Sequence, residues 1–256
     1  KELLLLYAER AEARRQPYYG DNALEQALRH TFAYVETEDQ LRAEEEILKD
    51  LENSRPMDRI LCGDVGFGKT EVALRAALRA ISSGKQVAIL APTTVLAAQH
   101  EKTFRERISN QLPVTISMLS RLTLPKDGRR TLKELAEGKI DCVIGTHRLL
   151  SKDVVFKNLG LVIIDEEQRF GVKQKERLKQ LKADIHMLTL SATPIPRTLQ
   201  MSLTGIKDLS LIATPPVDRL AIRSFTMPYD PVVLRNAILR EHYRGGCTFY
   251  VAPRIA

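Results

Sequence analysis

The sequence predicts an α/β protein with a central, mostly parallel sheet. Between residues 59 and 213, short β-branched runs alternate with longer helix-like segments, as they do where helices cover both faces of a parallel sheet. The chain has 256 residues and is 44% hydrophobic, which is enough for one good core and the start of a second. The proline-punctuated segment ATPPVDR, 213–219, separates this core from a further α/β pattern.

Seven strands are expected in the core, at 59–62, 86–90, 114–119, 141–145, 161–165, 186–192 and 209–213. A helix is expected over 69–84, where Gly84 would be its C-terminal cap. Residues 1–30 predict an N-terminal helical segment with a break around QPYYGDN, 16–22. Beyond the core, residues 221–227, 231–244 and 247–252 predict a strand, a helix and a strand. We therefore divide the chain into 1–35, 36–214 and 215–256.

The composition indicates which kind of partner and which cellular compartment the protein could have. Lys and Arg number 39 against 32 Asp and Glu, a balance that favours an anionic partner without requiring one. No apolar run approaches the roughly 20 residues that span a bilayer. The cysteines Cys62, Cys142 and Cys247 lie in or beside apolar runs and are expected to be reduced core thiols, as in cytoplasmic proteins. Because the chain begins with Lys1, we expect it to be part of a longer protein.

A glycine-rich motif follows the first expected strand. Residues 63–70, GDVGFGKT, match the pattern G-x-x-x-x-G-K-T between a strand and a helix. Backbone N–H groups of such a loop bind phosphate oxygens, the lysine contacts the β and γ phosphates, and the hydroxyl group ligates Mg²⁺. The motif predicts a nucleoside triphosphate site, with a chance glycine-rich turn as the alternative. Its residues are Gly63, Asp64, Val65, Gly66, Phe67, Gly68, Lys69 and Thr70.

An acidic pair ends the fifth expected strand. The run LVIIDEEQ, 161–168, places Asp165 and Glu166 directly after apolar residues. With a phosphate loop in the same sheet, we expect Asp165 to coordinate Mg²⁺, directly or through water, and Glu166 to act as general base on the attacking water. Taken alone, such a pair is more often a solvated strand end. The absence of an NKxD motif from the chain argues against a GTPase.

Five motifs in order carry a family resemblance: the phosphate loop, APTTVLAAQH (91–100), GTHRLL (145–150), DEEQ (165–168) and SATPIPRTL (191–199). Together they resemble the first RecA-like lobe of superfamily 2 helicases and translocases, over about residues 35–256. The residues of these motifs are similar to those of bacterial transcription-repair coupling factors, whereas RecG-type helicases usually have serine in place of Phe67.

The resemblance implies a motor that uses ATP and Mg²⁺ to move on double-stranded DNA. RNA polymerase and an excision-repair protein are the further partners that it implies. Residues 36–214 would be the ATP-binding lobe, 1–35 a helical linker, and 215–256 the truncated start of a second RecA-like lobe.

The resemblance also implies nucleotide contacts outside the loop. Gln40 would hydrogen-bond the adenine edge, and Phe32 or Tyr34 would pack near the base. The residues themselves allow another interpretation, in which Gln40 faces solvent in the first turn of a helix capped by Thr37. Gln168 stands where relatives more often have histidine, and it would bridge the γ-phosphate side to SATPIPRTL as part of the catalytic set. Because an amide does not titrate, this bridge should change little between about pH 6 and 8.

The nucleic-acid and coupling contacts are likewise implied by the resemblance. APTTVLAAQH and GTHRLL would hold phosphates through hydroxyl and N–H groups at helix starts, with ordinary N-caps and a structural histidine as the alternatives. SATPIPRTL would couple the nucleotide state to movement between lobes, unless it is only a proline-kinked helix start. The basic run 169–182 fits either a phosphate-tracking ridge or a solvated helix face. The residues implied are Thr93, Thr94, Gln99, Thr146 and His147 for nucleic acid, and Ser191, Thr193 and Arg197 for coupling.

We expect the chain to bind ATP but to turn it over poorly. The family carries its arginine finger on the second lobe, and such a residue is worth on the order of 10³ to 10⁵ in rate. Three alternatives remain open: a RecG-like fork-remodelling helicase, a non-catalytic module whose N-terminal helix docks a partner protein, and an unrelated P-loop phosphotransferase.

Overall fold

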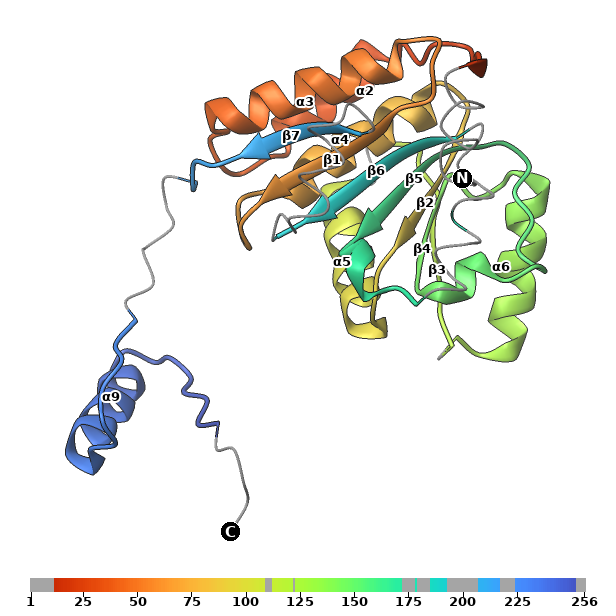
Figure 1. Cartoon of the computed structure of the whole chain (residues 1–256). Coiled ribbons are helices and arrows are strands. Elements are labelled where there is room, and N and C mark those ends of the chain that lie inside the picture. Colours follow the sequence, from red (N-terminus) through yellow and green to blue (C-terminus); the bar gives the residue numbers. More distant parts are fainter. Residues whose placement is uncertain are drawn as a thin grey trace, which may run out of the picture. The chain divides into compact units, whose positions relative to one another are not determined.

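The computed structural model describes residues 12–108, 112–121, 123–171, 178, 185–192, 207–216 and 224–251. The chain forms two compact units, Lys1–Asp218 and Arg219–Ala256. The first unit contains a seven-stranded sheet in the order β3-β4-β2-β5-β6-β1-β7 (Figure 1), in which every neighbouring pair is parallel. The strands are β1 (Asp58–Gly63), β2 (Gln86–Leu90), β3 (Ile116–Leu119), β4 (Cys142–Gly145), β5 (Leu159–Asp165), β6 (His186–Ser191) and β7 (Asp208–Ile212). All seven expected strands are confirmed.

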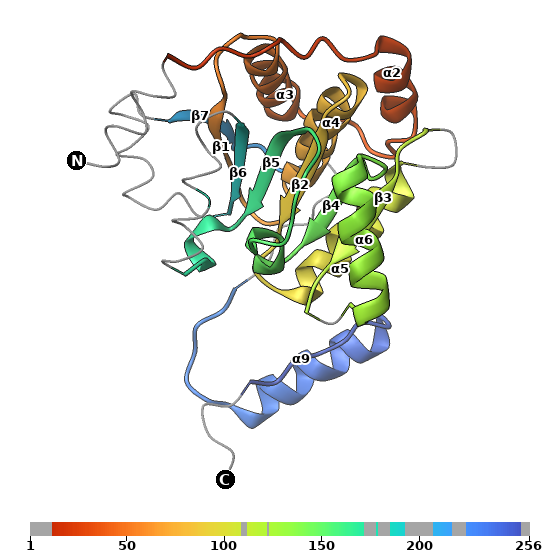
Figure 2. The ribbon, with the colours of Figure 1, turned by 90° about the vertical axis from the view of Figure 1, so that its right-hand side faces the viewer.

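Helices cover both faces of this sheet. One core packs α2 to α5 against one face, and a second core packs α6 and the 3₁₀ turn η1 against the other. Figure 2 shows α3 and α4 beside each other in the first of these layers. The elements are α2 (Asn22–His30), α3 (Glu38–Leu51), α4 (Lys69–Ser82), α5 (Thr94–Arg107), α6 (Pro125–Glu137), η1 (His147–Leu150) and the 3₁₀ turn η2 (Glu167–Arg169).

Burial on both faces explains the apolar strand sequences. Every residue of β1, β2 and β4 is buried. Along β5, Leu161 and Ile163 belong to the first core, and Val162 and Ile164 belong to the second. A central parallel strand therefore needs apolar residues at successive positions instead of alternate ones.

The helix boundaries follow local sequence signals. α3 begins with a capping box, in which Thr37 and Gln40 exchange hydrogen bonds between side chain and backbone. α4 ends at Ser82, and Gly84 follows with a φ of +73°, a left-handed conformation that glycine adopts at low cost. None of the helices in the described ranges is both long and apolar enough to cross a membrane.

The segment before α2 is attached to the sheet unit. Residues 13–21 form no helix or strand, as the break at 16–22 predicts, and residues 1–11 lie outside the described part. The N–H of Arg15 donates to the carbonyl of Ser54 at 2.7 Å, and the N–H of Tyr18 donates to that of Leu51 at 2.9 Å. Tyr18 is 1% exposed and packs edge-on against His186. This segment is therefore anchored at the end of α3 and the start of β6.

The second unit contains one described helix, α9 (Pro231–Tyr243), which Asp230 caps. The prediction of strands at 221–227 and 247–252 is wrong for the residues that the structure describes, because residues 224–227 and 247–251 form no strand. A strand needs a hydrogen-bonding neighbour, and the described part of this unit offers none. Cys247 is exposed, so the prediction of a core thiol is wrong there; Cys62 and Cys142 are buried as predicted.

Candidate nucleotide and nucleic-acid site

The predicted motifs meet at the carboxyl edge of the sheet. Neighbouring strands β4, β2, β5, β6 and β1 end there, because all strands are parallel. The expected nucleic-acid residues follow β4 and β2, whereas the phosphate loop and the acidic box follow β1 and β5. β5 is therefore the strand at which the two predicted sites adjoin.

The phosphate loop is a tight turn packed against α3. Gly66 and Gly68 both have a φ of +82°, which side chains rarely adopt. A Cβ atom on Gly68 would lie 2.4 Å from Nε2 of Gln40. Gly68 is also the N-cap of α4, and no side chain of the described residues caps this helix. The first N–H groups of α4 are left for an anion, so the loop fits a triphosphate.

Lys69 begins α4 and places its ammonium group inside the loop. Nζ donates to the carbonyl of Gly63 at 2.6 Å and to that of Asp64 at 3.0 Å. Burial lowers the pKa of Lys69, while the carboxylates of Glu166 and Asp165 act to raise it. The loop lysine and the acidic pair therefore share one electrostatic environment, although they are far apart in the sequence.

Gln40 is buried against the phosphate loop. The residue is 6% exposed, its Oε1 accepts the N–H of Thr37 at 3.0 Å, and its Nε2 donates to the carbonyl of Phe67 at 2.9 Å. The solvent-facing interpretation is wrong, because the capping box turns the amide toward the loop. The contact with adenine stays a prediction.

Phe32 and Tyr34 pack together beside two arginines. Their ring centroids are 5.6 Å apart in an edge-on arrangement. The guanidinium carbons of Arg75 and Arg107 lie 5.3 Å and 5.1 Å from the centroid of the Phe32 ring, within cation–π distance. These arginines hold Phe32 next to α4 and α5, and its contact with a base stays a prediction.

Glu166, the expected general base, has a strained backbone and a fixed side chain. Its φ of 52° is the single positive value of a non-glycine residue in the described ranges. Oε1 accepts the N–H of Ala192 at 2.9 Å, and Oε2 accepts a hydrogen bond from the amide of Gln168. Hydrogen bonds therefore link Gln168 to Ala192 of SATPIPRTL through the carboxylate of Glu166. Because the donor at Ala192 is a backbone N–H, no residue type in the sequence indicates this contact.

The coupling residues are described only in part. Ser191 is buried at the end of β6 and lies opposite Cys62 of β1. Thr193 and Arg197 lie outside the described residues, as does most of the basic run 169–182. Their roles stay predictions.

The expected nucleic-acid residues on and before α5 are accessible. Thr93 is the N-cap and accepts the N–H of Leu96 at 3.2 Å, which confirms the N-cap interpretation without removing the hydroxyl from the surface. Thr94 is half-buried, and Gln99 is exposed.

Thr146 and His147 follow β4 with buried polar atoms. Thr146 is 2% exposed, and neither its Oγ1 nor Nε2 of His147 has a hydrogen-bond partner among the described residues. Burial and the nearby Arg121 lower the pKa of His147, which favours the neutral ring. A buried hydroxyl without a hydrogen-bond partner is unusual in a folded protein, and within the described ranges Tyr18, Ser82 and Thr189 have one as well. The contact of Thr146 with nucleic acid stays a prediction.

Two further residues near the site were not predicted. His100 on α5 is buried, and its Nε2 lies 2.9 Å from Oδ2 of Asp165. Asp39 uses one oxygen to accept the N–H groups of Ala213 and Thr214, at 3.0 and 2.9 Å, and the hydroxyl of Thr214 at 2.8 Å. The Thr214 hydroxyl, followed by the two N–H groups, lowers the pKa of Asp39. His100 and Asp165, like Asp39 and Thr214, meet only because of the order of the strands. The spacing of these residues in the sequence therefore does not predict either contact.

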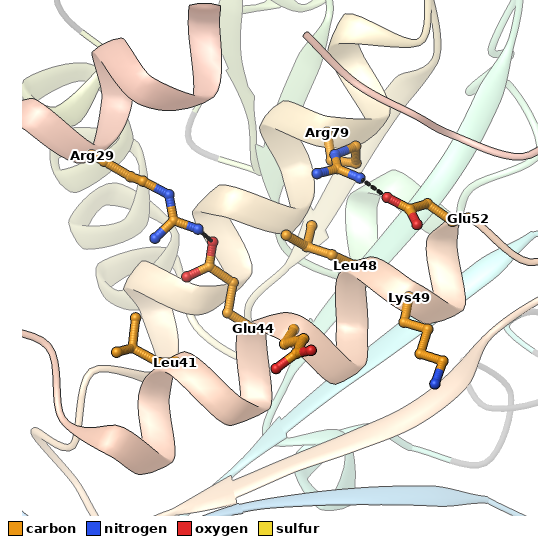
Figure 3. Close-up of a pocket in the computed structure, with 8 residues that line it drawn as sticks. Arg29, Leu41, Glu44, Leu48, Lys49, Glu52 and Arg79 are labelled. Atoms are coloured by element: carbon orange, nitrogen blue, oxygen red, sulfur yellow. Dashed lines mark hydrogen bonds and ion pairs between the residues drawn. The ribbon is translucent and has the colours of Figure 1, made fainter. Parts of the chain in front are cut away.

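A groove of about 530 Å³ lies among α2, α3 and α4 (Figure 3). Two ion pairs lie along it: Arg79 with Glu52 at 2.5 Å, and Arg29 with Glu44. None of its lining residues belongs to the predicted site. The groove is lined by Arg29, Leu41, Glu44, Glu45, Leu48, Lys49, Glu52 and Arg79.

The predicted motifs lie in a region of the chain that matches known proteins. Residues 37–202 match the family model described as DEAD/DEAH box helicase. The transcription-repair-coupling factor of Bacillus subtilis is 53% identical over 254 residues, which are 99% of this chain and 22% of that protein. The factor of Escherichia coli is 52% identical over 250 residues, 98% of this chain and 22% of that protein. The chain spans about a fifth of the length of these relatives, and the predicted resemblance is confirmed.

Solved structures support the fold. The structure of RecG bound to a three-way DNA junction has a TM-score of 0.79 and 34% identity, covering 96% of this chain and 34% of that one. A DEAD box protein from the hyperthermophile Methanococcus jannaschii has a TM-score of 0.58 and 22% identity, covering 76% and 54%, and shows the fold alone. The RecA-like lobe is therefore confirmed, while the start of a second lobe stays a prediction.

Proposed function

Because this chain belongs to the DEAD/DEAH box helicase family, whose members are ATP-dependent enzymes, we propose that it is the ATP-binding lobe of a double-stranded DNA translocase. The observation that carries the proposal is the layout of the carboxyl edge. The phosphate loop and the acidic box follow β1 and β5, and Thr146, whose buried hydroxyl has no hydrogen-bond partner in the described part of the chain, follows β4. This layout supports a triphosphate site and a nucleic-acid contact at one edge of the sheet.

The nucleotide chemistry is assigned to residues of the loop and the box. Lys69 and the N–H groups at the start of α4 would bind the β and γ phosphates. Thr70 and Asp165 would hold Mg²⁺, which neutralises developing charge on the phosphates when it is bound. Glu166 would accept the proton of the attacking water, and the donors from Ala192 and Gln168 hold its carboxylate in place for that step.

The DNA contacts are assigned to the β4 and β2 ends of the edge. The exposed residues Thr93 and Gln99 would meet phosphate oxygens, and the family resemblance implies the same role for Thr94, Thr146 and His147. Such contacts position a protein on DNA and read no sequence. The motor would therefore track the backbone.

The wider role rests on the relatives alone. Their name, transcription-repair-coupling factor, supports RNA polymerase and an excision-repair protein as partners, and a cytoplasmic location. A RecG-like fork helicase is the second candidate, favoured by the structural match at 34% identity. The higher identity to the coupling factors and the presence of Phe67 in the loop favour the first.

The nucleotide and DNA assignments are tested on the 256-residue chain. We expect Lys69→Ala to abolish binding of a fluorescent ATP analogue, and Glu166→Gln to retain that binding and lose residual hydrolysis. Thr146→Val keeps the side-chain shape but removes the hydroxyl, so it should weaken duplex DNA binding and leave ATP binding unchanged. Strong DNA-stimulated hydrolysis by the isolated chain would contradict the expected poor turnover.

Translocation is tested in a chimera. The chain replaces the matching residues of the Bacillus subtilis factor, and displacement of a triplex-forming strand from duplex DNA is measured with ATP. The chimera should displace the strand, and its Lys69→Ala version should not. Displacement that does not depend on Lys69 would contradict the proposal, and preferential unwinding of forked DNA without triplex displacement would favour the RecG-like candidate.

A further inference from the structure

We propose that His100 is a positioning residue for Asp165 and links nucleic-acid binding on α5 to the metal-binding end of the nucleotide site. This inference rests on the proposed function. It starts from a contact that no motif predicts, the hydrogen bond between Nε2 of His100 and Oδ2 of Asp165, at 2.9 Å.

The contact is shielded from water and directional. The side chains of His100 and Asp165 are 10% and 15% exposed. An ionised carboxylate can only accept hydrogen bonds, so the ring N–H of His100 donates. No other hydrogen bond to the Asp165 side chain occurs among the described residues. His100 therefore occupies one oxygen and leaves Oδ1 for a metal ion or its bound water.

The two residues come from neighbouring parts of the carboxyl edge. Asp165 ends β5, β5 pairs with β2, and α5 follows β2. Thr94 begins α5, and His100 lies six residues later on the same helix, about 9 Å along its axis. A helix is a rigid secondary element along which a shift can be transmitted. A shift of the first turn on binding phosphate would therefore reach the Asp165 carboxylate through His100.

Residues that hold a metal-ligating carboxylate contribute to metal affinity. Removing such a partner typically costs 10- to 100-fold in metal affinity or activity, because the ligand loses its fixed orientation. His100 should accordingly affect the Mg²⁺ dependence of nucleotide binding, and a purely structural histidine should affect only stability.

The experiment compares the whole chain with His100→Phe, His100→Gln and the control Glu106→Gln, an exposed position on the same helix. Binding of a fluorescent ATP analogue is titrated with Mg²⁺, with and without duplex DNA. We expect His100→Phe to raise the Mg²⁺ concentration at half-maximal binding about 10-fold and to remove any effect of DNA on it. Its DNA affinity without nucleotide should be unchanged. Glutamine keeps an N–H donor and should stay near wild type, as should the control.

The outcomes separate this inference from the function on which it rests. Equal Mg²⁺ midpoints in wild type and the Phe variant, with both folded by circular dichroism, would overturn the role of His100 and leave the proposed function standing. If the Phe variant does not fold, His100→Asn decides, because asparagine is too short to reach Asp165 and should behave as Phe is expected to. A wild-type chain that binds no analogue would overturn both.

Discussion

Two glycines with similar backbone angles have different surroundings. Gly68 in the phosphate loop has a φ of +82°, and an added Cβ would lie 2.4 Å from the Gln40 amide. Gly84 after α4 has a φ of +73°, and an added Cβ would meet no atom within 4 Å. Backbone strain is therefore common to both positions, whereas the steric conflict is confined to the loop.

We expect Gly68→Ala to weaken binding of an ATP analogue more than 10-fold and to lower the free energy of unfolding by about 2 kcal/mol, since strain and the clash with Gln40 act together. Gly84→Ala is the matched control: it should lower stability by about 1 kcal/mol through strain alone and leave nucleotide binding unchanged. Fluorescence titration and urea unfolding measure the two effects. Equal nucleotide affinity in both variants would contradict this account of the loop.

Two buried thiols and one buried phenol make the free energy of unfolding depend on pH in the alkaline range. Burial raises the pKa of the Cys142 and Cys62 thiols and of the Tyr18 phenol above their ordinary values of 9.0 and 10.0. Above about pH 9 the unfolded chain loses these protons while the folded chain retains them, so the stability that they contribute is full below that pH and is lost as pH rises. The free energy of unfolding should therefore fall from pH 8.5 to 10.5.

Denaturant unfolding across this range, repeated with Cys142→Ala, tests the assignment. The variant should show a smaller alkaline loss than wild type, and Cys247→Ala, at an exposed position, should show the same loss as wild type. An alkaline slope that all three proteins share would contradict it.

At the scale of elements, a buried arginine network holds the helix layer together. Arg75 on α4 is 5% exposed and pairs with Glu36, with Glu44 of α3 and with Glu71 of its own helix, at 2.7 to 3.0 Å. Glu71 also binds Arg107 of α5 at 2.6 Å. One network thus connects three helices, including the helix that starts at the phosphate loop.

Replacing Arg75 with Met should lower the free energy of unfolding by about 3 kcal/mol, because the buried carboxylates of Glu44 and Glu71 each lose one of their two cations. The matched control is Arg130→Met on α6, which breaks a pair with Glu134 on the same helix in an exposed setting and should cause no measurable change. Urea unfolding followed by circular dichroism compares them. Similar losses in the two variants would show that burial does not set the cost.

At the scale of the whole molecule, the two units differ in what they bury. The first contains two cores on the two faces of its sheet. In the second, no residue of 224–251 is buried, and Phe225, Phe249 and Val251 are more than 80% exposed. The described part of the second unit therefore has no hydrophobic core of its own.

A chain shortened to residues 1–216 should melt within about 3 °C of the full chain, a shift equivalent to roughly 1 kcal/mol for a domain of this size. It should also bind the ATP analogue with unchanged affinity. Differential scanning calorimetry and fluorescence titration measure both. A larger fall in Tm would mean that the second unit contributes to the core.

The sequence by itself determined the local features of this protein. Apolar runs set the strands, a capping box set the start of α3, and Gly66, Gly68 and Lys69 set the phosphate loop, because each depends on neighbours in the chain. The motif order was also enough to identify the family.

Only the tertiary structure decided which side chains meet. The order of β2, β5 and β6 brings His100 to Asp165 and the N–H of Ala192 to Glu166. The tertiary structure also shows that Gln40 faces the phosphate loop and that residues 224–227 form no strand. These features depend on pairing between distant segments, on backbone donors and on the presence of a neighbouring strand, and none of these leaves a periodicity or spacing in the sequence.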